Sequence, residues 1–370
     1  MDTYAFDALV IGAGIAGATT AAHLSADRRT ALIEAEEAPG YHTTGRSAAM
    51  WTGYYGPSDV TTLGQLSRPF LDAPPAGFTE TPLLAPRGSL TIATAAQASA
   101  LETLLGTTSG LRVIPLPELH ARVPALRPGH TVLAAIEDDA CDIDVAALLQ
   151  GYLKLHRTRG GALAVRSRAG RIDRRDGRWH VEVTGGAVFT ADILVNAAGA
   201  WGDDVAKLAG VAPLGLIPKR RTAAIIDPAP FVVKDWPMIN DFDEEFYCRP
   251  EARTRLMVSP ADETPMHPHD VQPDELDIAV GIEEMQRALA IEVRRVERSW
   301  AGLRTFTPDG SLAIGWDGAV EDFFWAVGQG GYGILTSPAA GRLAADLIAH
   351  RYPGTAAAVV KLVDPNRFAV

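Results

Sequence analysis

Three glycines near the N-terminus have the spacing of a dinucleotide-binding turn. Residues 12–17 read GAGIAG, which fits G-x-G-x-x-G, and Glu34 ends the next apolar stretch. In such a turn the first glycine permits a tight bend, the second lets the backbone approach a pyrophosphate at a helix N-terminus, and the third permits close helix–strand packing. The acid accepts hydrogen bonds from ribose hydroxyls. We therefore expect Gly12, Gly14, Gly17 and Glu34 to bind a dinucleotide.

Two further segments of small residues narrow the choice of dinucleotide. Residues 196–201 read NAAGAW and include Gly199, and residues 328–333 read GQGGYG just before a helical stretch. Backbone N–H groups at a helix start can stabilise the negative charge that a flavin acquires on reduction. Each segment alone is also compatible with a packing or hairpin glycine. Together with residues 12–17 they favour FAD over NAD.

Two arginines on separate predicted strands are suited to holding a carboxylate. Arg304 ends the apolar stretch 300–303, and Arg221 opens the stretch 222–226. A planar guanidinium donates two parallel hydrogen bonds to a carboxylate, which lysine cannot do. Period-2 alternation places Arg220 and Arg221 on opposite faces of the strand, so at most one of them is expected to point inward, toward the site. The pattern does not indicate which of the two it is. A solvent-exposed arginine is the alternative at each position.

The elements around the first glycine turn predict an α/β fold. Residues 8–11 and 29–34 have the apolar character of buried parallel strands, and residues 15–24 between them predict a helix. Strand, glycine turn, helix and strand form the opening of a doubly wound sheet. Two more buried strands are expected at 193–195 and 323–327.

Other segments belong to helices and to a different sheet. We expect a helix over 145–156, with Asp144 as its N-cap, and a helix over 338–350. Six prolines between Pro57 and Pro86 predict an irregular surface connection. The strands expected at 221–226 and 254–258 are assigned to a different sheet, and further strands are expected at 89–93 and 300–305.

Composition excludes several classes of protein. The 370 residues are 47% hydrophobic and 21% charged, which is typical of a globular protein and excludes disorder or a coiled coil. The net charge of −11 makes nucleic acid an unsuitable partner. Cys141 and Cys248 are too few for a cysteine-built metal site or a disulfide framework, so no metal is expected. No stretch reaches the roughly 20 apolar residues of a membrane span, and we expect a cytoplasmic protein.

Taken together, these motifs resemble a known family. The turn at 12–17, GRSAA at 45–49, NAAGAW, GQGGYG, PKRR at 218–221 and WAGLR at 300–304 are similar to segments of the D-amino acid oxidase superfamily of flavoproteins. Within that superfamily they most resemble the bacterial FAD-dependent D-arginine dehydrogenases. The resemblance extends from the first predicted strand to the last predicted helix.

The resemblance implies two interleaved domains. A doubly wound, Rossmann-like FAD-binding domain would comprise residues 1–85, 141–215 and 300–370. An α+β substrate-binding domain, built on a mostly antiparallel sheet, would comprise residues 86–140 and 216–299.

The resemblance also implies which residues bind the cofactor and the substrate. Besides the residues of the first turn, FAD would contact Arg46, Ser47, Ala48, Ala169, Gly330, Gly331, Tyr332, Gly333, Ile334 and Leu335. The substrate would contact Tyr55, Arg221, Tyr247 and Arg304. Neither cysteine lies in a segment assigned to the flavin, so the FAD is expected to be bound non-covalently.

The implied reaction is the oxidation of D-amino acids. The α-hydrogen would pass as hydride to flavin N5, the imino acid would hydrolyse to a keto acid and ammonia, and a quinone or oxygen would accept the electrons. A secondary-amine oxidase of the sarcosine or glycine type is the enzymatic alternative. A flavin-binding protein without turnover is the alternative from another class.

Two positions depart from the D-arginine dehydrogenase pattern. Met50 stands where those enzymes have a histidine, and Ser89 stands where they have a glutamate. A buried guanidinium side chain needs an acidic partner, and Ser89 offers none. We expect Met50, Ser89 and Tyr332 to line a substrate pocket that favours neutral, largely apolar side chains.

Overall fold

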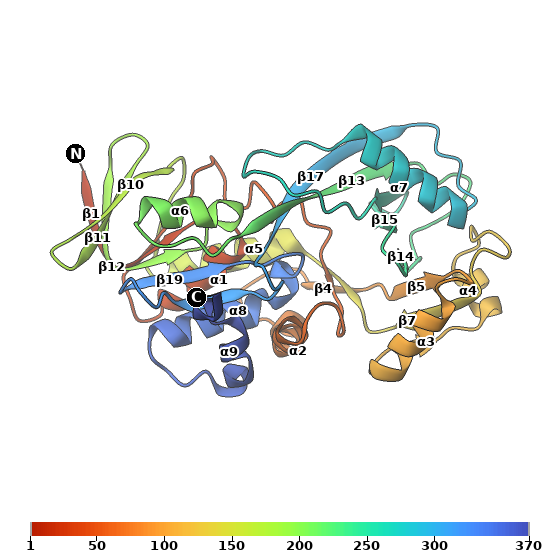
Figure 1. Ribbon diagram of the computed structural model, residues 1–370, viewed down its shortest axis with the longest axis horizontal. Helices are drawn as coiled ribbons and strands as arrows, with labels where there is room; N and C mark the ends of the chain where they lie inside the picture. The colour runs from red at the N-terminus through yellow and green to blue at the C-terminus, as the bar shows by residue number, and fades with distance from the viewer. Residues whose placement is uncertain (1, 369–370) are drawn as a thin grey trace.

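A computed structural model describes residues 2–368, which form two large sheets flanked by helices (Figure 1). The first sheet has the order β10-β11-β12-β1-β2-β9. In addition, β19 pairs with β12, and β18 pairs with β19. Its strands are β1 (Thr3–Ile11), β2 (Thr30–Ile33), β9 (Ala162–Ala164), β10 (Ala169–Arg175), β11 (Arg178–Val183), β12 (Val188–Asn196), β18 (Ala313–Trp316) and β19 (Phe323–Val327). β1 pairs in parallel with β2 and with β12, as the sequence predicts for the first two strands.

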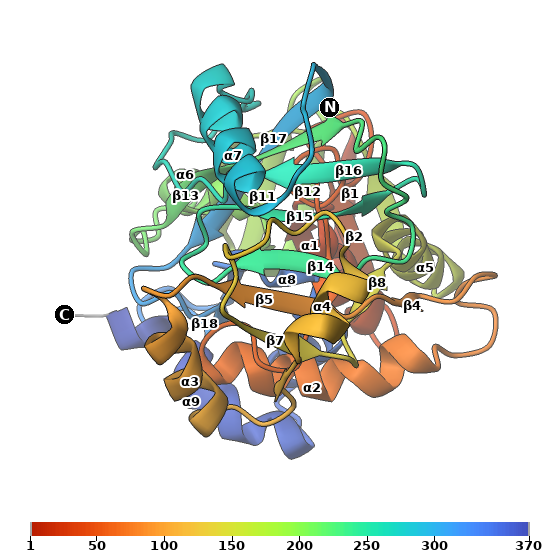
Figure 2. The same cartoon turned by 90° about the vertical axis from the view of Figure 1, so that its right-hand side faces the viewer.

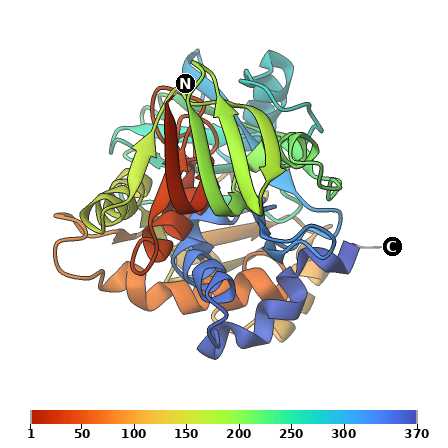
Figure 3. The same cartoon turned by 90° about the vertical axis from the view of Figure 1, so that its left-hand side faces the viewer.

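Both faces of this sheet are covered, although by different kinds of element (Figure 3). Alternate residues of β1 point to opposite faces. Ala8 and Val10 pack with the helices α1 (Ile15–Leu24), α5 (Val145–Thr158) and α8 (Gly333–Ile348). Leu9 and Ile11 pack with the β10–β11 hairpin and with α6 (Gly202–Leu208). The fold is therefore doubly wound around buried parallel strands, with a hairpin in place of helices on much of one face.

The second sheet lies beside the first and carries its own core (Figure 2). Its order is β17-β13-β16-β15-β14-β5-β7-β6. The strands are β5 (Ser89–Ala93), β6 (Arg112–Val113), β7 (Leu133–Glu137), β13 (Ile217–Ile226), β14 (Met238–Asp241), β15 (Tyr247–Glu251), β16 (Arg255–Ser259) and β17 (Val296–Phe306). β14 pairs in parallel with β5 while the other neighbours are antiparallel, so the sheet is mixed.

Smaller elements surround the two sheets. Helix α7 (Glu275–Ala288) packs on β13 and β16. The remaining elements are α2 (Ser58–Asp72), α3 (Ala98–Thr107), α4 (Leu116–Arg122) and α9 (Val360–Val363), 3₁₀ turns at Gly199–Trp201, Gly354–Val359 and Pro365–Phe368, and a small sheet of β3 (Met50–Trp51), β8 (Cys141–Ile143) and β4 (Leu84–Pro86). Within residues 2–368, no helix combines the length and the apolar character needed to span a membrane.

One expected domain boundary is wrong. The expected FAD-binding domain includes residues 300–306. In the structure, β17 pairs with β13 from Val296 to Phe306, so these residues belong to the second sheet. The apolar stretch 300–303 has the same composition as a strand of either sheet. Only the long-range pairing with β13 decides its place.

Two helices near prolines also differ from the prediction. Helix α8 begins at Gly333 and contains Pro338. Proline has no N–H to donate to the carbonyl of Ile334, and the Ser337 hydroxyl donates to this carbonyl instead (2.9 Å). Between Pro57 and Pro86, helix α2 was not expected at all. Pro57 sits just before its first residue, where a missing N–H costs little. Asp144 caps α5 as predicted, accepting from Ala147 N at 2.8 Å.

Candidate functional site

The first glycine turn has the close packing that its sequence predicts. Gly12 adopts φ +101°, and a Cβ there would lie 2.5 Å from the Ala197 carbonyl oxygen. A Cβ at Gly17 would lie 1.8 Å from the Gly12 carbonyl oxygen. No other residue fits either position without moving backbone. Helix α1 therefore starts directly against β1, with its positive end open to a ligand.

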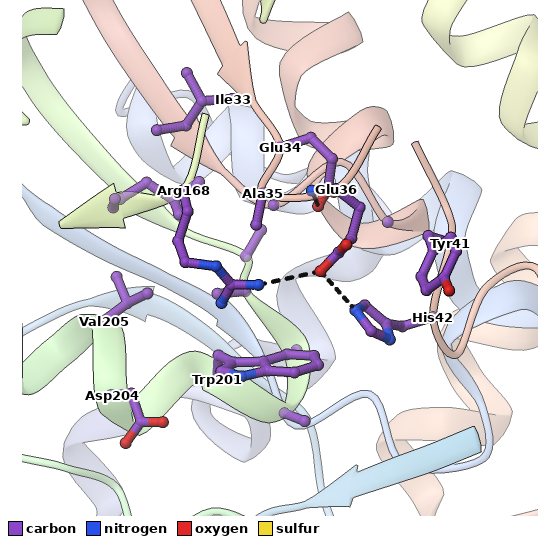
Figure 4. A pocket seen from close by; sticks show the side chains of 18 of the residues that line it. Ile33, Glu34, Ala35, Glu36, Tyr41, His42, Arg168, Trp201, Asp204 and Val205 are labelled. Atoms are coloured by element: carbon purple, nitrogen blue, oxygen red, sulfur yellow. Dashed lines mark hydrogen bonds and ion pairs between the residues drawn. The ribbon is translucent and has the colours of Figure 1, made fainter. Parts of the chain in front are cut away.

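A cavity of about 340 Å³ lies at the carboxyl ends of β1 and β2 (Figure 4). Gly12, Gly14, Glu34, Ala169 and Gly199 all line it. The Glu34 carboxylate is held in place at both oxygens, since it accepts from the backbone N–H groups of residues 13 (2.8 Å) and 36 (3.0 Å). The wall thus combines a fixed acid with a glycine-built backbone surface, which is what a ribose and a pyrophosphate require.

Four side chains that the sequence reading missed close the outer side of this cavity. Glu36 pairs with His42 and with Arg168, each at 3.1 Å, and the His42 ring packs against the Trp201 ring with centroids 4.6 Å apart (Figure 4). Trp201 belongs to the segment 196–201, which is notable for its small residues, His42 lies three residues before the GRSAA segment, and Arg168 immediately precedes Ala169. The sequence motifs therefore indicate this part of the site but not these four side chains.

Two further cavities continue the first one. The middle cavity, about 140 Å³, shares Gly14 and Thr44 with the first. It shares Arg221, Tyr247 and Arg304 with a third cavity of about 210 Å³. The three spaces form one elongated path from Glu34 to Ser89. A dinucleotide followed by a small substrate needs a site of this shape.

The residues expected at the flavin are distributed along this path. The middle cavity is lined by Arg46, Ser47, Ala48, Gly330, Gly331, Gly333 and Ile334, and Leu335 lines the third cavity. The Arg46 guanidinium turns away, because it donates to the carbonyls of Ala301 (2.9 Å) and Val271 (3.3 Å). Gly17 lines none of the three cavities and acts through packing alone.

Tyr332 does not occupy the position expected for it. It lines none of the three cavities, and its ring packs edge-on against Tyr55, with centroids 5.1 Å apart, and against Phe306 at 6.3 Å. Tyr332 is the N-cap residue of α8, which begins at Gly333, so its ring lies at the start of this helix beside the rings of Tyr55 and Phe306. Its contact with Tyr55 makes it a support for a cavity residue.

Arg304 faces the junction of the middle and third cavities without an acidic partner. Its Nη1 lies 3.4 Å from the Tyr55 hydroxyl, and within residues 2–368 no carboxylate forms an ion pair with it. Tyr247 lines the same two cavities. Burial alone would raise the pKa of Tyr247, but the charges of Arg304 and Arg221 lower it below its usual value. The junction is therefore a place where a negative charge is stabilised.

Arg220 and Arg221 are both buried, but only Arg221 lines the cavities, so one of the two points into the site, as the alternation predicts. They do lie on opposite faces of β13, but each has acidic neighbours. Arg221 donates to the Asp262 carbonyl and to the Glu263 carboxylate, both at 3.0 Å. Arg220 pairs with the Asp262 carboxylate (3.1 Å) and with Asp277 of α7, which covers the outer face.

The far end of the third cavity joins polar and apolar side chains. Met50 and Ser89 both line it, together with Tyr54, Thr91 and Asn240, which the sequence reading missed. Asn240 Nδ2 donates to Ser89 Oγ at 3.1 Å. The remaining wall is formed by Leu104, Met238, Phe242 and Phe246. These polar groups are neutral, and they make the wall less apolar than Met50 alone suggests.

Three acids lie near this far end, and the first of them, Asp241, lines the cavity and is buried. Glu244 is exposed and lines the cavity, and it adopts φ +59° in the turn between β14 and β15. Glu137 lies directly across from Ser89 in the β5–β7 pairing and is only 4% exposed. Its Oε1 accepts from Gly53 N at 2.6 Å, while its Oε2 has no hydrogen-bond partner among the described residues. Burial raises the pKa of Glu137 to about 7.

The comparison with protein families identifies the class of this protein. A family model described as FAD dependent oxidoreductase (DAO) matches residues 7–347. The chain belongs to this family. FAD is therefore its cofactor, and the glycine surface, the fixed Glu34 and the elongated path fit that molecule. Within the described residues, no cluster of three or more histidine, cysteine or acidic side chains is arranged to hold a metal ion.

Several of the individual proteins similar to this chain are named as dehydrogenases or oxidases. Mitochondrial dimethylglycine dehydrogenase of Rattus norvegicus is 28% identical over 215 residues, which cover 53% of this chain and 24% of that protein. The chain spans about a third or less of the length of the curated relatives it matches. Glycine oxidase from Geobacillus kaustophilus superposes with a TM-score of 0.81 at 21% identity, covering 94% of this chain and 96% of that one. L-Proline dehydrogenase from P. horikoshii superposes with a TM-score of 0.84 at 19% identity, covering 100% and 98%. These superpositions show a common fold, and the closer resemblance to D-arginine dehydrogenases stays a prediction.

Proposed function

We propose that this FAD-dependent oxidoreductase oxidises D-amino acids with neutral side chains. The observation that carries the proposal is Arg304, a guanidinium at the junction of two cavities with no acidic partner in the described chain. A buried charge without a partner is costly, so the site is suited to a ligand that brings a carboxylate. The first sheet would bind FAD and the second sheet would bind the substrate.

In this proposal the chain positions the substrate. Arg304 holds the carboxylate through paired hydrogen bonds, and Tyr55 and Tyr247 donate to the same group. This anchoring directs the α-carbon toward the middle cavity, where Gly331 leaves room beside Arg304. The bound flavin supplies the acceptor for the α-hydrogen, and anchoring the carboxylate turns the oxidation into a reaction between fixed partners.

The far end of the third cavity would set the preference among side chains. Ser89 and Asn240 satisfy each other with a neutral hydrogen bond, and Asp241 is occupied by Gln97 and by the N–H of Asp243. Glu244, the other acid on the cavity wall, is exposed in the turn between β14 and β15. A guanidinium or ammonium side chain would therefore find no acid on the cavity wall that is both buried and unoccupied. Met50 offers a flexible apolar surface that adapts to several side-chain shapes.

A secondary-amine oxidase is the second candidate. The names of similar proteins, dimethylglycine dehydrogenase and glycine oxidase among them, favour it. The carboxylate site at Arg304 serves an N-methylated glycine as well as an α-amino acid. A flavin-binding protein without turnover is less well supported, because it has no need of an unpaired guanidinium facing a cavity.

A substrate panel tests the proposed preference. We expect kcat/KM, measured with an artificial electron acceptor, to be higher for D-leucine, D-methionine and D-phenylalanine than for D-arginine and D-lysine. Ser89→Glu should move the preference toward D-arginine, and Ser89→Gln is its uncharged control of equal size. A wild-type enzyme that prefers D-arginine would contradict the argument from Met50 and Ser89. Parallel assays with oxygen and with a soluble quinone would identify the class of acceptor.

A further inference from the structure

The two guanidinium groups of the junction differ in what surrounds them. The Arg221 side chain is 8% exposed, and its Nη2 lies 3.0 Å from Glu263. The same carboxylate also bonds Lys219, at 2.7 Å, on the solvent side. Arg304, which lines the same two cavities, makes no ion pair with any described residue. One cation of the junction is thus already paired while the other is free.

Glu263 is ionised where it meets these cations. Burial would raise its pKa, but Lys219, Arg221 and Arg304 lower it below its usual value. The Glu263 side chain is 43% exposed, so water can solvate its carboxylate when a ligand takes its place at Arg221. A carboxylate ligand at the junction would meet Arg221 only by competing with this resident carboxylate.

We propose that Glu263 is the resident counter-ion of Arg221, which it withholds from the ligand, so that Arg304 alone anchors the carboxylate and Glu263 sets the affinity of the site. The inference rests on the carboxylate site of the proposed function. Glu263 itself lines neither of the two cavities, and it acts through Arg221, which lines both.

The sign of the effect follows from the pairing. Removing the charge of Glu263 releases a second guanidinium toward the cavity, so carboxylates should bind more tightly. We expect about a tenfold decrease in Kd, equal to about 1.4 kcal/mol. The gain should need Arg221, since Lys219 lies on the solvent side over the Phe306 ring. If Glu263 merely oriented Arg221, its removal would weaken binding.

The experiment is a double-mutant cycle on the FAD-loaded protein. The probe is 4-methylpentanoate, which has the carboxylate and side chain of leucine but no amine and cannot be oxidised in this way. Its Kd is read from the change in flavin absorbance and, independently, from the rise in Tm with ligand concentration. The variants are Glu263→Gln, Glu263→Ala, Arg221→Met and the double variant Glu263→Gln/Arg221→Met. Glu283→Gln, which removes an exposed glutamate paired with Arg287 on α7, is the control.

We expect both Glu263 variants to tighten binding about tenfold, Arg221→Met to change it little, and the double variant to lose the gain. Unchanged or weaker binding in Glu263→Gln would overturn the inference, and so would a gain that survives in the double variant. A large loss in Arg221→Met alone would also overturn it, because Arg221 would then already serve the ligand. Wild-type protein that binds no 4-methylpentanoate would overturn the carboxylate site itself, which separates the two failures.

Discussion

Replacing Arg304 with methionine should remove most of the affinity for carboxylates and leave the fold intact. Removing one partner of a buried, hydrogen-bonded charge pair costs about 2–5 kcal/mol. Tyr55 and Tyr247 remain as donors to the carboxylate, so the lower part of this range applies. A loss of about 2–3 kcal/mol corresponds to roughly a 30- to 150-fold increase in Kd.

The same substitution should not destabilise the protein without ligand. Arg304 has no ion pair in the described chain, so its removal leaves no carboxylate unpaired. A methionine of similar length fills the space with apolar surface. We expect the free energy of unfolding of Arg304→Met to equal or exceed that of the wild type, whereas loss of a structural ion pair would lower it.

The assay combines three readings. The Kd for 4-methylpentanoate measures the anchor, the KM for D-leucine measures it in turnover, and FAD released per chain measures cofactor content. Arg298→Met is the matched control, because Arg298 lies on the same strand, is exposed and covers the Trp300 ring. A Kd for Arg304→Met within threefold of the wild type, with FAD content unchanged, would refute the assignment of the carboxylate to Arg304.

Three further outcomes follow from the structure. A Cβ at Gly331 would lie 2.8 Å from Arg304 Nη1, so Gly331→Ala should displace the guanidinium and raise the KM for D-leucine about tenfold. Gly170→Ala, whose Cβ meets its nearest neighbour at 3.7 Å, should leave this KM unchanged, and equal KM values in the two variants would contradict the prediction. Because burial raises the pKa of Glu137 from 4.5 to about 7, the folded state binds its proton more tightly and the wild type loses stability as pH rises from about 4.5 to 7. Glu137→Gln should therefore gain about 2–3 kcal/mol on the wild type in urea unfolding between pH 5 and pH 8, and a difference that does not depend on pH would be evidence against the buried acid. Acid precipitation should release a yellow supernatant, since neither Cys141 nor Cys248 lines the three cavities, and colour kept in the pellet would show a covalent flavin.

The parts that sequence predicts well are those fixed by neighbours along the chain. The turn at 12–17 needs glycine because Gly17 packs on Gly12, five residues away. Residues 8–11 and 31–33, on either side of α1, are apolar because both faces of the sheet are covered there. Asp144 caps α5 through a bond to Ala147, three residues on. Each of these features is a local pattern.

The parts that sequence misses depend on partners far along the chain. Arg220 is buried because α7 brings Asp277 over the outer face of β13. Glu137 is the last residue of β7, which the sequence analysis does not predict, and only the pairing of β7 with β5 shows that it lies across from Ser89. Arg221 is paired because Glu263, more than 40 residues away in the sequence, lies beside it. The sequence around Glu263 has no pattern that indicates a cavity. Residue type alone could not distinguish the paired arginine from the free one.

Anaerobic mixing of the FAD-loaded protein with single amino acids tests the central claim most directly. We expect D-leucine to bleach the flavin absorbance, and L-leucine and N-methylglycine to leave it unchanged. The result that would contradict the account is bleaching by N-methylglycine but not by D-amino acids, which would assign the site to secondary amines. Absence of bleaching by any of the three would contradict turnover of these substrates.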